Sequence, residues 1–110
     1  MSDDDSYQID IPPSFMALHI DAGRQKPNAT REVVAARYEL CEDLANMLTE
    51  TAKNMQFSLG ITEQHVLERC HRGLTGNEGA VVTEAEAQWV IRRLAELLDW
   101  QAHVPDHWLL

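Results

Sequence analysis

Apolar side chains recur every three or four residues between positions 31 and 59. This spacing places them along one side of an α-helix, so the segment is predicted to form one long helix. Thr30 or Asn28 is suited to capping its start, and Gly60 is the residue type that ends helices. The predicted core stripe comprises Val34, Tyr38, Cys41, Ala45, Leu48, Ala52, Met55 and Leu59, widened by Val33, Leu40, Leu44 and Met47.

The opposite side of this long helix is polar and carries Glu32, Glu39, Asp43, Asn46 and Glu50. The apolar stripe covers roughly half of the helix circumference at about 100° per residue. Because a stripe this wide is able to contact two neighbouring helices, we expect the long helix to be the central one.

Two shorter helices are predicted after the long one. Thr62 is expected to cap a helix over residues 63–74, and Thr83 with Glu86 forms a capping-box pattern before a helix over residues 84–100. One long helix with two shorter ones predicts an all-α fold, a small helical bundle. The shorter helices have the apolar faces Val66, Leu67, Cys70 and Leu74, and Ala87, Val90, Ile91, Leu94, Ala95, Leu97 and Leu98.

The flanking segments are assigned from their composition. Residues 1–8 are rich in Asp and are expected to form a disordered acidic tail. The remainder, residues 9–110, is expected to be a single helical domain. It begins with an extended arm and a loop over residues 9–30 and ends with an apolar tail over residues 101–110.

The arm contains two consecutive prolines, Pro12 and Pro13, which exclude a helix interior at that point. The six residues that follow, from Phe15 to Ile20, fit either a short strand or a single helical turn, and the sequence does not decide between them.

Charge narrows the classes of partner. The 110 residues include 9 Lys+Arg and 18 Asp+Glu, for a formal net charge of −9. Nucleic acids and anionic membranes require clustered positive charge, which this chain lacks, whereas an acidic surface favours basic partners. With no secretory signal pattern and no run of about 18 apolar residues, we expect a cytoplasmic protein whose two cysteines, Cys41 and Cys70, are reduced.

The clearest candidate binding site lies on the predicted helix over residues 84–100. Trp89 and Trp100 are eleven positions apart, which returns to nearly the same angle on a helix, and both fall opposite the predicted core face. Arg93 and Glu96 lie between them on the same stripe. Because Trp and Arg dominate binding hot spots, this stripe predicts a docking surface for another protein.

Three ways of covering the two tryptophans remain open, since exposed apolar patches mark contact sites. A second copy of the chain covers them in a homodimer, or an unrelated protein does so. Alternatively, the chain covers them itself, with the arm residues Ile9, Ile11, Phe15 and Met16 or the tail residues Trp108, Leu109 and Leu110.

Metal and catalytic patterns are weak. His103 and His107 are four positions apart, which suits two ligands on one helix face, but Pro105 between them breaks that geometry. We therefore expect no metal and no cofactor. A homodimeric small-molecule or metal-responsive regulator, with a site near His103, His107 and Cys70, is the alternative function. The chain has no GxxxxGK[ST], HExxH or GxSxG motif, so we expect a protein that is not an enzyme.

Four stretches of the chain are distinctive, namely IPPSFMALHI, RYELCEDLANML, LGITEQHVLERCHRGL and EAQWVIRRLAELLDW. They resemble a family of small acidic bacterial proteins whose members are sometimes labelled "ATPase with chaperone activity". The resemblance assigns no role to any residue. Because the chain has no phosphate-binding loop, the label implies a small accessory partner of a chaperone machine. With the tryptophan stripe, it predicts a non-enzymatic cytoplasmic protein-interaction module, an adaptor or chaperone accessory protein.

Overall fold

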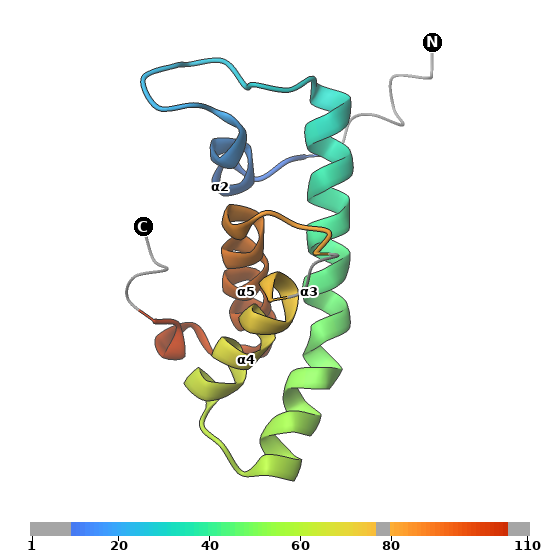
Figure 1. Ribbon diagram of the computed structural model, residues 1–110, viewed down its shortest axis with the longest axis vertical. Helices are drawn as coiled ribbons and strands as arrows, with labels where there is room; N and C mark the ends of the chain where they lie inside the picture. The colour runs from blue at the N-terminus through green and yellow to red at the C-terminus, as the bar shows by residue number, and fades with distance from the viewer. Residues whose placement is uncertain (1–9, 77–79, 106–110) are drawn as a thin grey trace. The chain divides into compact units, whose positions relative to one another are not determined.

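The computed structural model describes residues 10–76 and 80–105. Within these ranges the chain is helical and contains no β-strand, which confirms the predicted all-α bundle (Figure 1). It divides into two compact units, Met1–Leu40 and Cys41–Leu110, and α3 begins in the first and continues into the second. The helices are α2 (Pro13–Met16), η1 (Ala17–His19), α3 (Arg31–Leu59), α4 (Glu63–Thr75), α5 (Glu84–Leu98) and η2 (Gln101–His103), where η1 and η2 are short 3₁₀ turns.

The arm of the first unit forms a helical turn rather than a strand. Pro13 occupies the start of α2, where its fixed φ suits a helix and its missing N–H is not needed. The Phe15 side chain is fully buried. Its ring centroid lies 5.7 Å from that of Tyr38 on α3, edge to face, and 5.4 Å from that of His19. This aromatic contact holds the arm turn against the first part of α3.

The ends of α3 follow from local chemistry. Of the two candidate caps, the Thr30 hydroxyl accepts a hydrogen bond from the Val33 N–H at 3.3 Å. At the other end Gly60 adopts a φ of 64°, and its N–H donates to the Gln56 carbonyl at 2.9 Å. A left-handed residue directly after the last turn is the usual helix stop, and glycine adopts it without a Cβ clash.

Both shorter helices begin at the threonines that the sequence indicates. The Thr62 hydroxyl accepts from the His65 N–H at 3.2 Å. The Thr83 hydroxyl accepts from the Glu86 N–H at 3.1 Å, while the Glu86 carboxylate accepts from the Thr83 N–H at 2.9 Å. This reciprocal pair is the predicted capping box, and it fixes the start of α5.

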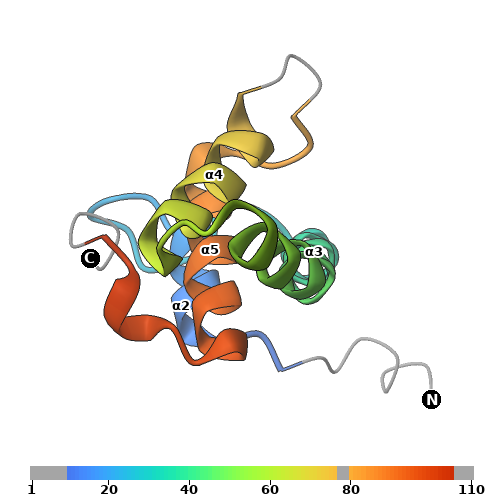
Figure 2. The same ribbon diagram turned by 90° about the horizontal axis from the view of Figure 1, so that it is seen from below.

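In the second unit α4 and α5 form the closest helix pair, and the later part of α3 runs beside them (Figure 2). Seven of the fifteen residues of α5 are buried, whereas α3 contributes three small residues, Cys41, Ala45 and Ala52. The expectation that the long helix is the central one is therefore wrong for this unit. Its core cluster consists of Ala52, Val66, Leu67, Cys70, Ile91, Leu94, Ala95 and Val104.

The buried stripes are narrower than the periodicity predicts. Four residues assigned to core faces are exposed, namely Val33 and Met47 at the edge of the α3 stripe, Leu59 in the last turn of α3 and Leu97 in the last turn of α5.

Candidate functional site

Trp89 does not lie on an outward-facing stripe, so this part of the prediction is wrong. Its side chain is 4% exposed. Five of the six residues from Glu86 to Ile91 are buried, so this part of α5 is enclosed around most of its circumference. Farther along α5, Arg93 and Glu96 keep part of their side chains in solvent, so the predicted stripe is exposed there but not at Trp89. The Trp89 ring is therefore not accessible on the surface for contact with a partner.

Trp100 lies outside the helix altogether. α5 ends at Leu98 because Asp99 adopts a left-handed φ of 62°, and the Trp100 N–H turns back to donate to the Ala95 carbonyl at 2.7 Å. Such a turn commonly brings the next apolar residue against the helix. Trp100 is partly buried against the core cluster that contains Val104.

The eleven-residue helical spacing between Trp89 and Trp100 therefore has no structural meaning. The chain itself covers Trp100 in part, since the ring packs on the second unit's own core. Of the other residues proposed to cover the tryptophans, Ile9, Trp108, Leu109 and Leu110 lie outside the described residues, and Ile11, Phe15 and Met16 belong to the first unit.

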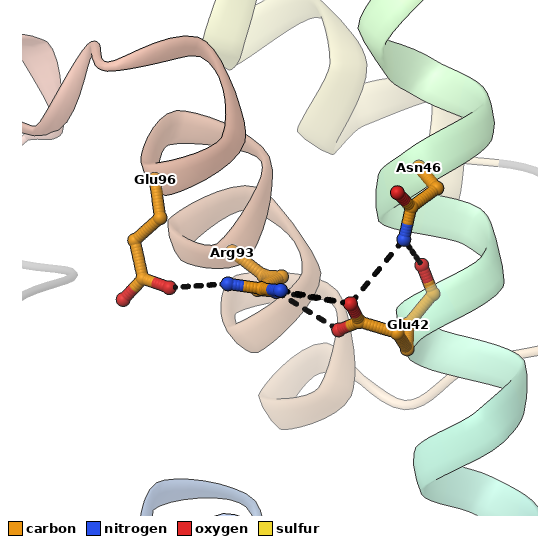
Figure 3. A network of polar contacts seen from close by, with 4 residues as sticks. All are labelled: Glu42, Asn46, Arg93 and Glu96. Carbon is orange, nitrogen blue, oxygen red and sulfur yellow. Dashed lines mark hydrogen bonds and ion pairs between the residues drawn. The ribbon is translucent and has the colours of Figure 1, made fainter.

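Arg93 and Glu96 do come together, but as part of a network that joins two helices (Figure 3). Arg93 donates through Nε and Nη2 to the two carboxylate oxygens of Glu42 on α3, each at 2.9 Å, and through Nη1 to Glu96 at 3.0 Å. The Asn46 amide also donates to the Glu42 carboxylate, at 3.3 Å. The hydrogen bonds that Arg93 donates to Glu42, and then to Glu96, raise the pKa of its guanidinium.

This two-pronged pairing is the strong form of an ion pair, because the planar guanidinium matches the carboxylate. The side chains of Arg93 and Glu42 are 34% and 22% exposed. Arg93 therefore holds α5 to α3 within the second unit, and its guanidinium is already occupied by two carboxylates.

The exposed surface that sequence reasoning missed lies along the later part of α3. Five residues there are all exposed and follow one another at intervals of four, three, four and three, and we call them the outer seam: Asp43, Met47, Glu50, Asn54 and Phe57. Phe57 is 90% exposed and Met47 is 62% exposed. At 100° per residue these positions lie within one 80° sector, on the far side from the buried Cys41, Ala45 and Ala52.

A signal for this surface was available in the sequence. Phe57 falls on the polar side of the predicted long helix, outside the stripe that begins at Val34, and an aromatic residue there is out of place. Met47 was assigned to the core because it stands at the edge of the stripe, where burial depends on how near the next helix comes.

The carboxylates of the outer seam differ from that of Glu42. Among the described residues, neither Asp43 nor Glu50 forms an ion pair, whereas Glu42 is held by Arg93. The outer seam therefore combines two apolar side chains with two carboxylates that form no ion pair with any described residue.

The described residues gather no metal site, since they bring together no group of three or more His, Cys, Asp or Glu side chains that could hold an ion. His103 lies exposed in η2, and His107 lies outside the described residues. Cys41 and Cys70 are buried and form no disulfide within the described part of the chain, and burial raises the pKa of the Cys70 thiol. A buried thiol of raised pKa is a poor nucleophile, because the thiolate is the reactive form.

The first unit carries a hollow of about 440 Å³ along its loop, lined by Gly23, Arg24, Gln25 and Lys26. It is open to solvent and bordered by residues of one loop. Binding sites for small molecules are enclosed and largely apolar, so this hollow does not have the character of such a site.

Within the described ranges, no helix is both long enough and apolar enough to cross a membrane. Comparison with known proteins finds no family whose model matches the chain, and it finds no match among the curated proteins or the solved structures.

Proposed function

We propose that the protein is a non-enzymatic, cytoplasmic protein-interaction module, an adaptor or chaperone accessory protein, that binds through the outer seam of α3. The observation that carries the proposal is the exposure of Phe57, 90% of whose side chain is open to solvent. Aromatic residues and Met are enriched where proteins contact one another. Met47, 62% exposed on the same face, extends the apolar surface.

Exposure of Phe57 brings no stability to the isolated protein. Removing a Phe side chain from water is favourable by roughly 1.5–3 kcal/mol, and folding leaves that free energy unused at this position. A partner that covers the ring gains it on binding. The outer seam replaces the tryptophan stripe as the proposed docking surface because its apolar atoms are accessible.

The test is affinity capture of the tagged full-length protein from its native lysate, with the Phe57→Ala variant beside it. Val81→Ala is the matched control, because Val81 is also an exposed apolar residue, 60% open to solvent, and lies outside α3. We expect a stoichiometric partner that is lost from Phe57→Ala and retained by Val81→Ala.

Circular dichroism and the melting temperature should be the same for all three proteins, since neither side chain is buried. Equal capture by wild type and Phe57→Ala, with the fold intact, contradicts the proposed surface. Recovery of the chain alone from every sample contradicts the interaction module itself.

A further inference from the structure

The outer seam has the geometry of a surface that receives a helix. Its five residues alternate at intervals of four and three, the spacing that keeps one line of side chains facing a partner helix in a coiled coil. From Asp43 to Phe57 the seam extends about 21 Å at 1.5 Å per residue, the length of about four helical turns. A partner helix of similar length would therefore contact every position.

The charges along the seam indicate which kind of helix fits. Asp43 and Glu50 are seven residues apart, so their carboxylates stand about 10 Å from one another along the helix axis. Neither forms an ion pair with another described residue. Met47 lies between the two carboxylates along the seam and Phe57 lies beyond Glu50, and both offer apolar contacts. The complementary helix carries cations two turns apart, with apolar residues beside them.

A second copy of this chain does not meet that requirement. An antiparallel pair of outer seams centred on Glu50 would place the two Glu50 carboxylates opposite each other, and a parallel pair would align Asp43 with Asp43. Each copy also has a formal net charge of −9. Like charges in register oppose association, so charge disfavours a homodimer through this face.

We propose that the outer seam of α3 binds a basic amphipathic helix of another protein, with Lys or Arg opposite Asp43 and Glu50 and apolar side chains opposite Met47 and Phe57. This inference rests on the proposed function and adds the chemical class of the partner. The basic side chains speed the encounter and set the register, and the apolar contacts hold the complex.

The test uses the full-length protein and a defined probe, a fluorescent 21-residue helical peptide with Leu on one face and Lys at heptad spacing beside it. A second peptide has Glu in place of every Lys. Binding is followed by fluorescence anisotropy at 0.15 M salt, where charges further apart than about 8 Å are largely screened. We expect the Lys peptide to bind and the Glu peptide not to bind.

Two pairs of variants locate the contact. Glu50→Lys should weaken binding of the Lys peptide by about tenfold, because an attraction becomes a repulsion at close range, whereas Glu68→Lys on α4 makes the same change of charge and should have little effect. Phe57→Ala should weaken binding several-fold, and Val81→Ala should not.

Equal weakening by Glu50→Lys and Glu68→Lys overturns the proposal, because the probe then senses net charge rather than the seam. If the Lys and Glu peptides bind equally well, or if neither peptide binds, the proposal of a basic partner is also overturned. In that case a native partner captured in a Phe57-dependent manner would still support the proposed function, so the two failures are distinguishable.

Discussion

α5 and the later part of α3 are both helices with many apolar residues, yet they have opposite roles in the second unit. α5 buries seven of its fifteen residues, including Trp89 and Ile91, and is enclosed around most of its first half. The later part of α3 buries Cys41, Ala45 and Ala52 and leaves Phe57 in solvent. The large apolar residues in the first half of α5 therefore contribute to the core, whereas Phe57 of α3 does not, and we propose that it contacts a partner.

Truncating the two aromatic residues in turn should reveal the largest difference between the two helices. Trp89→Ala should lower the free energy of unfolding by about 3–5 kcal/mol, because a buried ring leaves a cavity. Phe57→Ala should change it by less than about 0.5 kcal/mol, as exposed substitutions do. Urea unfolding followed by circular dichroism measures both, and similar losses in the two variants would show that the assignment of roles is wrong.

The start of α5 provides a second, smaller contrast. Thr83→Ala removes the hydroxyl of the capping box and should cost about 1 kcal/mol of stability. Thr51→Ala, at an exposed position within α3, removes the same hydroxyl without a capping role and should cost nothing, since Ala favours helix. The same unfolding experiment compares them. A loss in Thr51→Ala as large as that in Thr83→Ala would contradict the capping role.

Glu42 on α3 forms an ion pair with Arg93 on α5, whereas Glu50 in the outer seam forms none with a described residue. A double-mutant cycle of Glu42→Ala and Arg93→Ala should give a coupling of about 0.5–1 kcal/mol, because the pair is well aligned but partly solvated. The same cycle with Glu50→Ala in place of Glu42→Ala should give no coupling. Coupling between Glu50 and Arg93 would show that the outer seam is not independent of the core.

The smallest predicted effect concerns acid stability. A hydrogen bond from Gln88, and then the interaction with His71 at 2.9 Å, lower the pKa of Glu84 below its usual value of 4.5. A carboxyl whose pKa is lower in the folded state stabilises the protein above pH 4.5, and that contribution is lost as the pH falls below this value. The free energy of unfolding should fall between pH 6 and pH 3 by slightly less in Glu84→Gln than in the wild type. An equal fall in both proteins would contradict the contribution of Glu84.

Local signals in the sequence predicted most of the fold. The α3 helix spans the range that its periodicity predicts, and Thr62, Thr83 and Gly60 act at the ends of helices as their chemistry requires. These features depend on neighbouring residues in the chain, so a single sequence contains them. The turn at Asp99 was missed because a left-handed aspartate has a weaker signature than glycine.

The site was predicted less well, because exposure depends on the tertiary neighbours of each helix face. Trp89 stands on the side of α5 that its pattern marks as outward, yet it is buried. Met47 stands on the side of α3 that its pattern marks as inward, yet it is exposed. Both errors come from counting apolar residues on one helix without knowing which faces its neighbours cover.

Binding through the outer seam is tested most directly by photo-crosslinking in the native cell, with Phe57 replaced by the photoreactive analogue p-benzoylphenylalanine. The same replacement at Val81 serves as the control, because that position is also exposed. We expect one discrete crosslinked partner from position 57 that is absent from position 81. No crosslink at position 57, or the same crosslinks at both positions, would contradict the claim that the outer seam of α3 is the binding surface.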